Sequence, residues 1–215
     1  MISLEHKTKN EEVIVTAKYQ LSAAKNATVH VEYQFSKNGQ IAVTTSLDTK
    51  NQTLPMLPKF GTNFIINKDF DAVEWLGRGP FENYQDRKTA ALVGQYKSSV
   101  AELYFSYIRP QENGYKTENR WVKFTNKNGE GILITAPKHF GFSTHHQYNT
   151  DFDEGEQKNQ RHTTDIVTRD FVNINIDDVQ MGVGGDTSWG TLPHEKYQIE
   201  AKNRSFTYVI SPIKK

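Results

Sequence analysis

Cysteine is absent from this sequence. Without thiols the chain has no disulfide bonds, no thiolate metal site and no cysteine nucleophile. The absence does not indicate a compartment, because a disulfide-free protein is compatible with either a reducing or an oxidising environment.

Long apolar runs and an excess of charge of one sign are also missing. No apolar run approaches the roughly 20 residues that a membrane-spanning helix needs. The sequence has 26 Lys and Arg residues against 25 Asp and Glu residues, a formal net charge of +1. Electrostatic binding to nucleic acid needs a basic excess on one face. We therefore expect neither a membrane nor a nucleic acid as a partner.

The first residues, Met1 to Lys7, lack the hydrophobic core of a signal peptide. Two interpretations follow. The protein is not secreted, or this chain is an internal piece of a longer protein.

Helical patterns are scarce, and only residues 86–92, with Asp86 as a candidate N-cap, carry such a signal. Apolar residues instead recur at every second position, which places one face of a strand on a core and the other face in water. This alternation covers Val13 to Leu21, Val29 to Phe35, Ile41 to Leu47, Val172 to Ile176 and Phe206 to Ile210. The aromatic content of 12% also suits pleated, half-buried surfaces.

Turn residues separate the alternating runs. Asn38-Gly39 and Asn128-Gly129 each stand between two such runs, which is a strong hairpin signal. Many short strands joined by turns predict an all-β fold, a large antiparallel β-sandwich. We expect residues 1–215 to form one domain with large sheets rather than two small domains.

The candidate metal-binding residues of this sequence do not match the motifs that bind metal ions. The polar segment Asn149 to Arg161 is predicted to be a loop, and its acidic part, Asp151 to Glu156, resembles a calcium loop only superficially. An EF-hand needs glycine sixth and an acid twelfth, whereas here glycine is fifth and His162 is twelfth. His145 and His146 are neighbours on opposite faces of a predicted strand, so they could not hold one ion. We predict no metal site in this chain.

Two segments concentrate functional groups, Trp75 to Arg87 and Tyr107 to Tyr115. Both mix aromatic side chains with Arg, Glu and Asn. Proteins bind sugars with such sets, because aromatic faces stack on the C–H face of the ring while carboxylates, amides and guanidinium groups take the hydroxyls. The alternative is that buried ion pairs hold loops against a sheet. The side chains concerned are Glu82, Arg87, Glu112 and Arg120.

A third segment, Gly182 to Pro193, is rich in glycine and carries Trp189. A Trp on a loop outside any alternating run is more readily displayed to solvent than a Trp inside a strand. A core position for Trp189 is the alternative.

These three segments carry a resemblance to a known family. Residues 75–87, WLGRGPFENYQDR, resemble the W-x-G-x-G-P-x-E-N-Y-x-D-R signature of the C-terminal, small-chain domain of large bacterial β-galactosidases, in glycoside hydrolase family 2. Residues 110–114 and 120–121 resemble its P-Q-E-N-G…R-W element, and residues 181–190 resemble its M-G-x-G-G-x-x-S-W-G element. The blocks follow the family's order, and the resemblance runs over nearly the whole chain.

The resemblance implies a supersandwich fold similar to galactose mutarotase. It also implies that the chain is the C-terminal piece of a retaining enzyme that hydrolyses terminal β-D-galactosides such as lactose. The parent's two catalytic glutamates lie on a TIM barrel outside this chain, so no residue here is expected to be catalytic. Whether the parent works in the bacterial cytoplasm or the periplasm stays open.

By the same resemblance, Trp189 is the substrate-binding residue of this chain, a platform for the aglycone sugar at the mouth of the active site. No cofactor is expected in this chain, and any Mg²⁺ or Na⁺ of the parent is bound outside it. The implied partners are the β-galactoside substrate, the catalytic barrel and further copies of the parent in a homo-oligomer.

Two alternatives remain at this point. The chain could be a stand-alone carbohydrate-binding or structural module without catalysis. It could also be an aldose mutarotase, which needs a His and a Glu converging on the sugar ring oxygen and the anomeric hydroxyl. The sequence shows no motif that pairs them.

Overall fold

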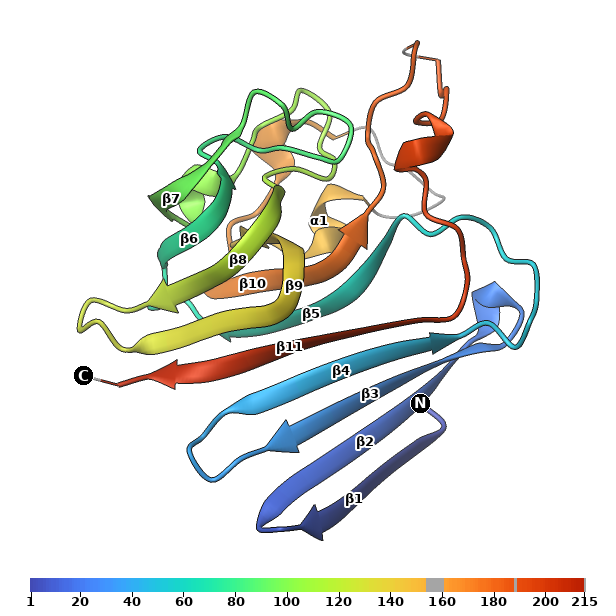
Figure 1. Cartoon of the computed structure of the whole chain (residues 1–215). Coiled ribbons are helices and arrows are strands. Elements are labelled where there is room, and N and C mark those ends of the chain that lie inside the picture. The colour runs from blue at the N-terminus through green and yellow to red at the C-terminus, as the bar shows by residue number, and fades with distance from the viewer. Residues whose placement is uncertain (154–160, 188, 215) are drawn as a thin grey trace.

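The computed structural model describes residues 1–153, 161–187 and 189–214, and there the chain forms an 11-stranded antiparallel sheet (Figure 1). The strands are β1 (Ser3–Lys9), β2 (Glu12–Leu21), β3 (Ala27–Phe35), β4 (Ile41–Asp48), β5 (Lys59–Asn67), β6 (Ala72–Gly79), β7 (Leu92–Ser99), β8 (Lys116–Thr125), β9 (Gly131–His145), β10 (Phe171–Gln180) and β11 (Arg204–Ile213). The helices are short: α1 (Asn149–Phe152), η1 (Ser22–Ala24), η2 (Ala101–Leu103), η3 (Thr163–Asp165) and η4 (Glu195–Tyr197). The predicted all-β fold is confirmed.

The sheet divides at β9. The main path runs β1-β2-β3-β4-β11-β9-β8-β6-β7, and β10 pairs with β9 and β5 away from this path. The first part of β9, Gly131 to Thr135, pairs with β11, whereas its last part, Gly141 to His145, pairs with β10. The two limbs that leave β9 therefore diverge. They meet again through their side chains, because the hydroxyls of Thr62 on β5 and Tyr208 on β11 are hydrogen-bonded at 2.7 Å.

The hydrophobic core lies between these limbs, which gives the predicted sandwich arrangement. One cluster of buried side chains includes Val43 of β4 and Phe206 of β11 from one limb, and Ile174 of β10 from the other. Trp75 of β6 packs edge-on against Phe142 of β9, with ring centroids 5.8 Å apart. Burying each large side chain of this kind contributes about 1.5–3 kcal/mol.

The two predicted hairpins are confirmed. Gly39 and Gly129 both have a φ of +83°, a backbone conformation that glycine adopts without strain. Each turn is closed by a pair of backbone hydrogen bonds, for example Gly39 N–H to the Ser36 carbonyl and Ser36 N–H to the Gln40 carbonyl, both at 2.9 Å.

Strand β10 differs from the expected half-buried pattern, because both of its faces are covered. Its apolar residues face the core, while Asn173 and Asn175 on the other face are also buried. The Asn173 side-chain amide donates to the Gln147 carbonyl at 2.9 Å, and the Asn175 amide donates to the Ser143 hydroxyl at 3.1 Å. Polar side chains are tolerated here because they are hydrogen-bonded.

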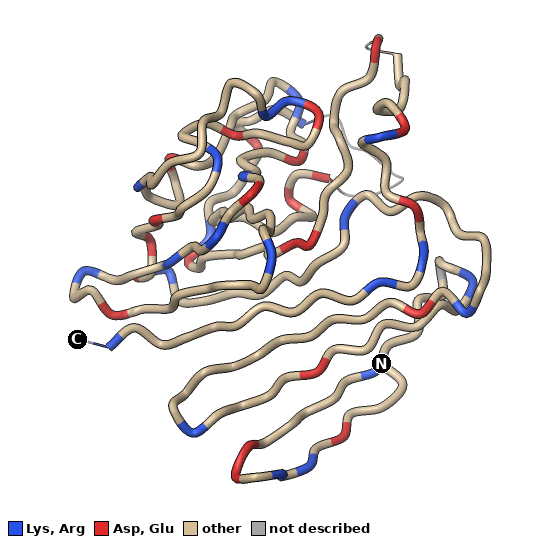
Figure 2. Tube along the Cα trace, in the orientation of Figure 1, with Lys and Arg blue, Asp and Glu red and all other residues tan. Residues whose placement is uncertain are grey.

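Basic and acidic residues are interspersed along the described trace on both limbs of the sheet (Figure 2). No helix of the described residues is both long enough and apolar enough to cross a membrane.

Candidate functional site

The three segments singled out by the sequence meet at one cavity of about 600 Å³. Its described lining consists of Tyr84, Arg87, Tyr107, Arg109, Pro110, Gln111, Glu112, Phe152, Asp153, Arg161, Val183 and Gly184. Each segment therefore contributes to the wall. A cavity of this size falls in the range of small-molecule binding sites.

The first segment begins on β6 and is anchored there by Trp75. The indole is fully buried, and its N–H donates to the Arg78 carbonyl at 3.1 Å. Gly77 lies so close to Asn119 of β8 that an added Cβ would stand 2.1 Å from the Asn119 amide oxygen. This close approach explains why the segment requires glycine at position 77.

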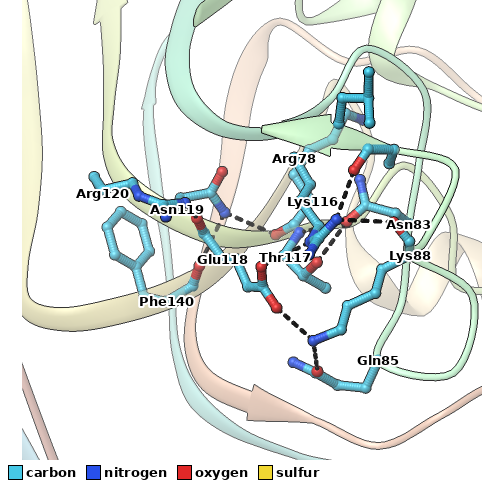
Figure 3. A network of polar contacts seen from close by, with 12 residues as sticks. Arg78, Asn83, Gln85, Lys88, Lys116, Thr117, Glu118, Asn119, Arg120 and Phe140 are labelled. Carbon is cyan, nitrogen blue, oxygen red and sulfur yellow. Dashed lines mark hydrogen bonds and ion pairs between the residues drawn. The ribbon is translucent and has the colours of Figure 1, made fainter. Parts of the chain in front are cut away.

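Asn83 fastens the following loop to β8 (Figure 3). Its side-chain oxygen accepts hydrogen bonds from the Thr117 N–H at 2.9 Å and the Thr117 hydroxyl at 2.6 Å. The Asn83 backbone N–H donates to the Tyr115 carbonyl at 2.8 Å. All of these groups are buried, so the loop leaves β6 in one fixed orientation.

The carboxylate of Glu118 on β8 also anchors this segment, because it forms ion pairs with Arg78 and Lys88 (Figure 3). Glu118 has a φ of +55° within an irregular stretch of β8. Burial disfavours its ionisation, but the two cations outweigh this effect and hold the pKa of Glu118 below its usual value. The Arg78 guanidinium also donates to the Ala91 carbonyl at 2.8 Å.

Glu82 joins the first segment to the second. Its side chain is only 6% exposed and forms an ion pair with Arg87. The Gly114 N–H donates to Glu82 Oε2 at 2.7 Å, and the Tyr107 hydroxyl binds Oε1. The ion-pair interpretation is thus confirmed for Glu82 and Arg87, which hold two loops together.

For Glu112 the pair is a long one with Lys59, and for Arg120 the interpretation is wrong. Arg120 donates to the Glu118 carbonyl at 2.6 Å, and Lys59 Nζ lies 4.0 Å from Glu112 Oε2. Burial of the Glu112 carboxyl raises its pKa, an effect that Lys59 only partly offsets. Glu112 lines the cavity, whereas Glu82 is not among its described lining residues.

Asp86 joins the first segment to the third. Its Oδ2 accepts a hydrogen bond from the Gly184 N–H at 2.7 Å, and an added Cβ at Gly182 would lie 2.6 Å from the same oxygen. The helical turn expected for residues 86–92 is therefore absent: these residues form turns, and Asp86 binds a distant backbone N–H instead of capping a helix.

Trp189 belongs to the segment between β10 and η4. Figure 1 shows that this segment projects from the molecule. The Trp189 side chain is 93% exposed, so the alternative of a core position is wrong. Within the loop, His194 Nε2 and Asp186 Oδ1 are hydrogen-bonded at 2.7 Å. Trp189 does not line the cavity, although Val183 and Gly184 at the base of the same loop do.

The two adjacent histidines point to different partners. His145 is fully buried, and its Nε2 lies 2.9 Å from the side-chain oxygen of Asn113. Burial lowers the pKa of His145 to about 3. His146 instead contacts the Phe171 carbonyl at 2.6 Å and Asp71 at 3.0 Å. Among the described residues that line the cavity none is a histidine, so nothing at this site favours mutarotase chemistry.

The acidic loop does not form a cation site in the part that can be described. Asp151 binds the Arg169 guanidinium through both carboxylate oxygens, at 2.6 and 2.8 Å. Residues 154–156, which carry the rest of the acidic pattern, lie outside the described residues. Within the described ranges no three His, Asp or Glu side chains come together in a way that could hold a metal ion.

The sequence interpretation missed one part of the wall. Phe152, Asp153 and Arg161 line the cavity, although residues 149–161 were expected to be only a polar loop. Phe152 could have indicated this contact, because a large apolar residue in an otherwise polar segment is usually packed against the rest of the protein.

Comparison with known proteins gives a consistent result. The sequence profile of the family described as "Beta galactosidase small chain" matches residues 2–210. The chain is 37% identical over 189 residues to a β-galactosidase of Priestia megaterium, which covers 87% of this chain and 18% of that protein. It is 32% identical over 194 residues to the β-galactosidase of Pseudoalteromonas haloplanktis, covering 90% and 17%. The β-galactosidase of Streptococcus thermophilus is 31% identical over 206 residues, covering 95% and 20%.

The chain thus spans between 17% and 20% of the length of these relatives. Among solved structures, a GalM/aldose epimerase homologue from C. elegans aligns over 98% of this chain and 68% of that chain, with a TM-score of 0.44 and 8% identity.

Proposed function

The chain belongs to the β-galactosidase small-chain family, and from that premise we propose that it is the C-terminal domain, spanning residues 1–215, of a retaining β-galactosidase. The substrate class is terminal β-D-galactosides such as lactose. The single observation that carries the proposed role of this domain is the projecting loop with its nearly fully exposed Trp189.

The two catalytic glutamates belong to another part of the parent, its TIM barrel. A retaining glycosidase needs two carboxyl groups about 5–5.5 Å apart, one as nucleophile and one as acid and base. Glu82 is a poor candidate for either task, because its carboxylate is bound to Arg87, Tyr107 and the Gly114 N–H. The domain instead packs against the barrel, and the parent assembles as a homo-oligomer. Its Mg²⁺ and Na⁺ ions are bound outside this chain.

The purified chain is accordingly expected to hydrolyse no chromogenic β-galactoside above a mock preparation, even at high protein concentration. Reproducible turnover that disappears in Glu112→Gln would contradict this prediction and give the chain an active site of its own. Turnover that persists in this variant and in Glu82→Gln would point to a contaminating enzyme.

Trp189 is the residue through which the domain contacts substrate. A flat indole stacks on the apolar face of the leaving sugar without fixing its hydroxyl pattern, which suits a site that releases or exchanges its aglycone.

In the full-length enzyme, Trp189→Ala is expected to raise the KM for lactose about three- to tenfold. Loss of an aromatic contact of about 0.5–1.5 kcal/mol corresponds to that factor. Hydrolysis kinetics with lactose, and the affinity for glucose as acceptor, measure the effect. Leu192→Ala, which removes an exposed apolar side chain from the same loop, is the matched control and should leave both values unchanged. Equal KM values for Trp189→Ala and the parent enzyme would refute the platform.

A further inference from the structure

The segment from Tyr107 to Glu112 presents polar groups to the cavity. The side chains of Arg109 and Gln111 are exposed there and have no hydrogen-bonding or ionic partner among the described residues. The Glu112 side chain is 35% exposed, its Oε2 lies 4.0 Å from Lys59 Nζ, and its Oε1 is buried without a hydrogen-bond partner in the described part of the chain. The cavity wall therefore offers a guanidinium, an amide and a carboxylate side by side along the chain.

The backbone that carries these groups is held in place by Asn113. The Asn113 side-chain oxygen accepts the Phe105 N–H at 3.0 Å, and its amide donates to the Gln111 carbonyl at 3.0 Å. The neighbouring Gly114 N–H is fixed by Glu82 at 2.7 Å. Hydrogen bonds hold the backbone of this segment in one conformation, while the side chains of Arg109 and Gln111 remain available to a ligand. The segment is therefore a preorganised binding surface, because little conformational entropy is lost on binding.

Aromatic rings complete the wall. The Tyr107 hydroxyl is bound by Glu82 and Arg87, which fixes the orientation of its ring. The ring of Phe152 also lines the cavity and stacks on Tyr104, with centroids 5.9 Å apart.

The charge of the lining is nearly balanced. Three arginines and two acidic residues line the cavity, and the buried Glu82 already neutralises one of these arginines, Arg87. A phosphate or nucleotide site would need a clear positive excess. The lining is therefore suited to a neutral, hydroxyl-rich ligand.

We infer that this cavity is a saccharide-binding pocket, in which Arg109, Gln111 and Glu112 hydrogen-bond the hydroxyls of a neutral mono- or disaccharide beside the ring of Tyr107. Trp189 does not line the cavity, so the pocket rests on its own chemistry and not on the role proposed for Trp189. The chain then has two separate places at which a sugar is held.

The test is a calorimetric or NMR titration of the 215-residue chain with galactose, glucose and lactose, and with inorganic phosphate as the anionic probe. At least one saccharide is expected to bind with a Kd on the order of 1 mM. The double variant Arg109→Ala/Gln111→Ala is expected to weaken this binding about tenfold or more, since it removes two hydrogen-bonding groups. Its melting temperature should match the parent chain, because neither side chain has a partner to lose.

The controls separate this pocket from the Trp189 platform. Lys7→Ala, on the edge strand β1, is the matched control and should bind the saccharide as the parent chain does. Trp189→Ala should keep the part of the binding that the double variant loses. Binding that is lost in Trp189→Ala but kept in the double variant would overturn the pocket and support the platform. No saccharide binding, or tighter binding of phosphate than of any saccharide, would also overturn it.

Discussion

Glu82→Ala is expected to lower the free energy of unfolding by about 3 kcal/mol. The substitution removes the acceptor of the buried Gly114 N–H and the partner of Arg87. A buried donor left without an acceptor costs about 1–3 kcal/mol, and breaking a buried ion pair by deleting one partner costs about 3–5 kcal/mol. Arg87 is partly exposed and can be rehydrated, which places the sum near the lower bound of the ion-pair range.

Urea or guanidinium denaturation of the chain measures this effect. Glu82→Gln keeps an oxygen for the Gly114 N–H and should recover part of the loss. Glu130→Ala removes an exposed carboxylate from the β8–β9 hairpin and is the matched control, with an expected change within about 0.5 kcal/mol. If Glu82→Ala is as stable as the parent chain, the two loops are held together by other contacts than those assigned to Glu82.

The strands were the most predictable part of the fold. Alternation identified β2, β3, β4, β10 and β11, and all of these except β2 place apolar residues in the core cluster. On β2, Val13 and Tyr19 of the alternating run are exposed. It did not reveal that β10 is covered on both faces. From the sequence, Asn173 and Asn175 are predicted to face solvent, whereas in the structure both are buried. Hydrogen bonding to residues distant in sequence is what makes these positions polar and buried at once.

The convergence of the three segments was not accessible from local patterns. Glu82 binds Gly114 and Asp86 binds Gly184, contacts between residues 32 and 98 positions apart. Spacing along a chain does not encode such contacts, because they depend on the path of the sheet. The choice between sugar binding and ion pairing was open for the same reason. The structure distinguishes the two acidic residues: Glu82 forms an ion pair with Arg87, whereas Glu112 lines the cavity.

Asp177 makes stability depend on pH. It lies on β10, fully buried, with an oxygen so close to Gly61 that an added Cβ there would be 2.1 Å away. Burial raises the pKa of Asp177 to about 7 from 3.8, against the opposing charge of Lys59. Between pH 4 and 7 the folded chain therefore keeps a proton that the unfolded chain has released. The contribution of Asp177 to stability is present below pH 4 and is lost as the pH rises to about 7.

Asp177→Asn isolates this effect. The parent curve alone does not, because buried His145, with its pKa lowered to about 3, contributes stability that rises with pH over nearly the same range. The variant keeps His145, so its unfolding free energy minus that of the parent should increase by on the order of 3 kcal/mol between pH 4.5 and 8. Denaturation at several pH values gives this difference. Asp69→Asn, in the exposed turn after β5, is the control, and its difference in unfolding free energy from the parent should not change with pH. A flat difference for Asp177→Asn as well would mean that Asp177 is ionised in the folded chain throughout, with Lys59 and the Tyr115 hydroxyl outweighing its burial.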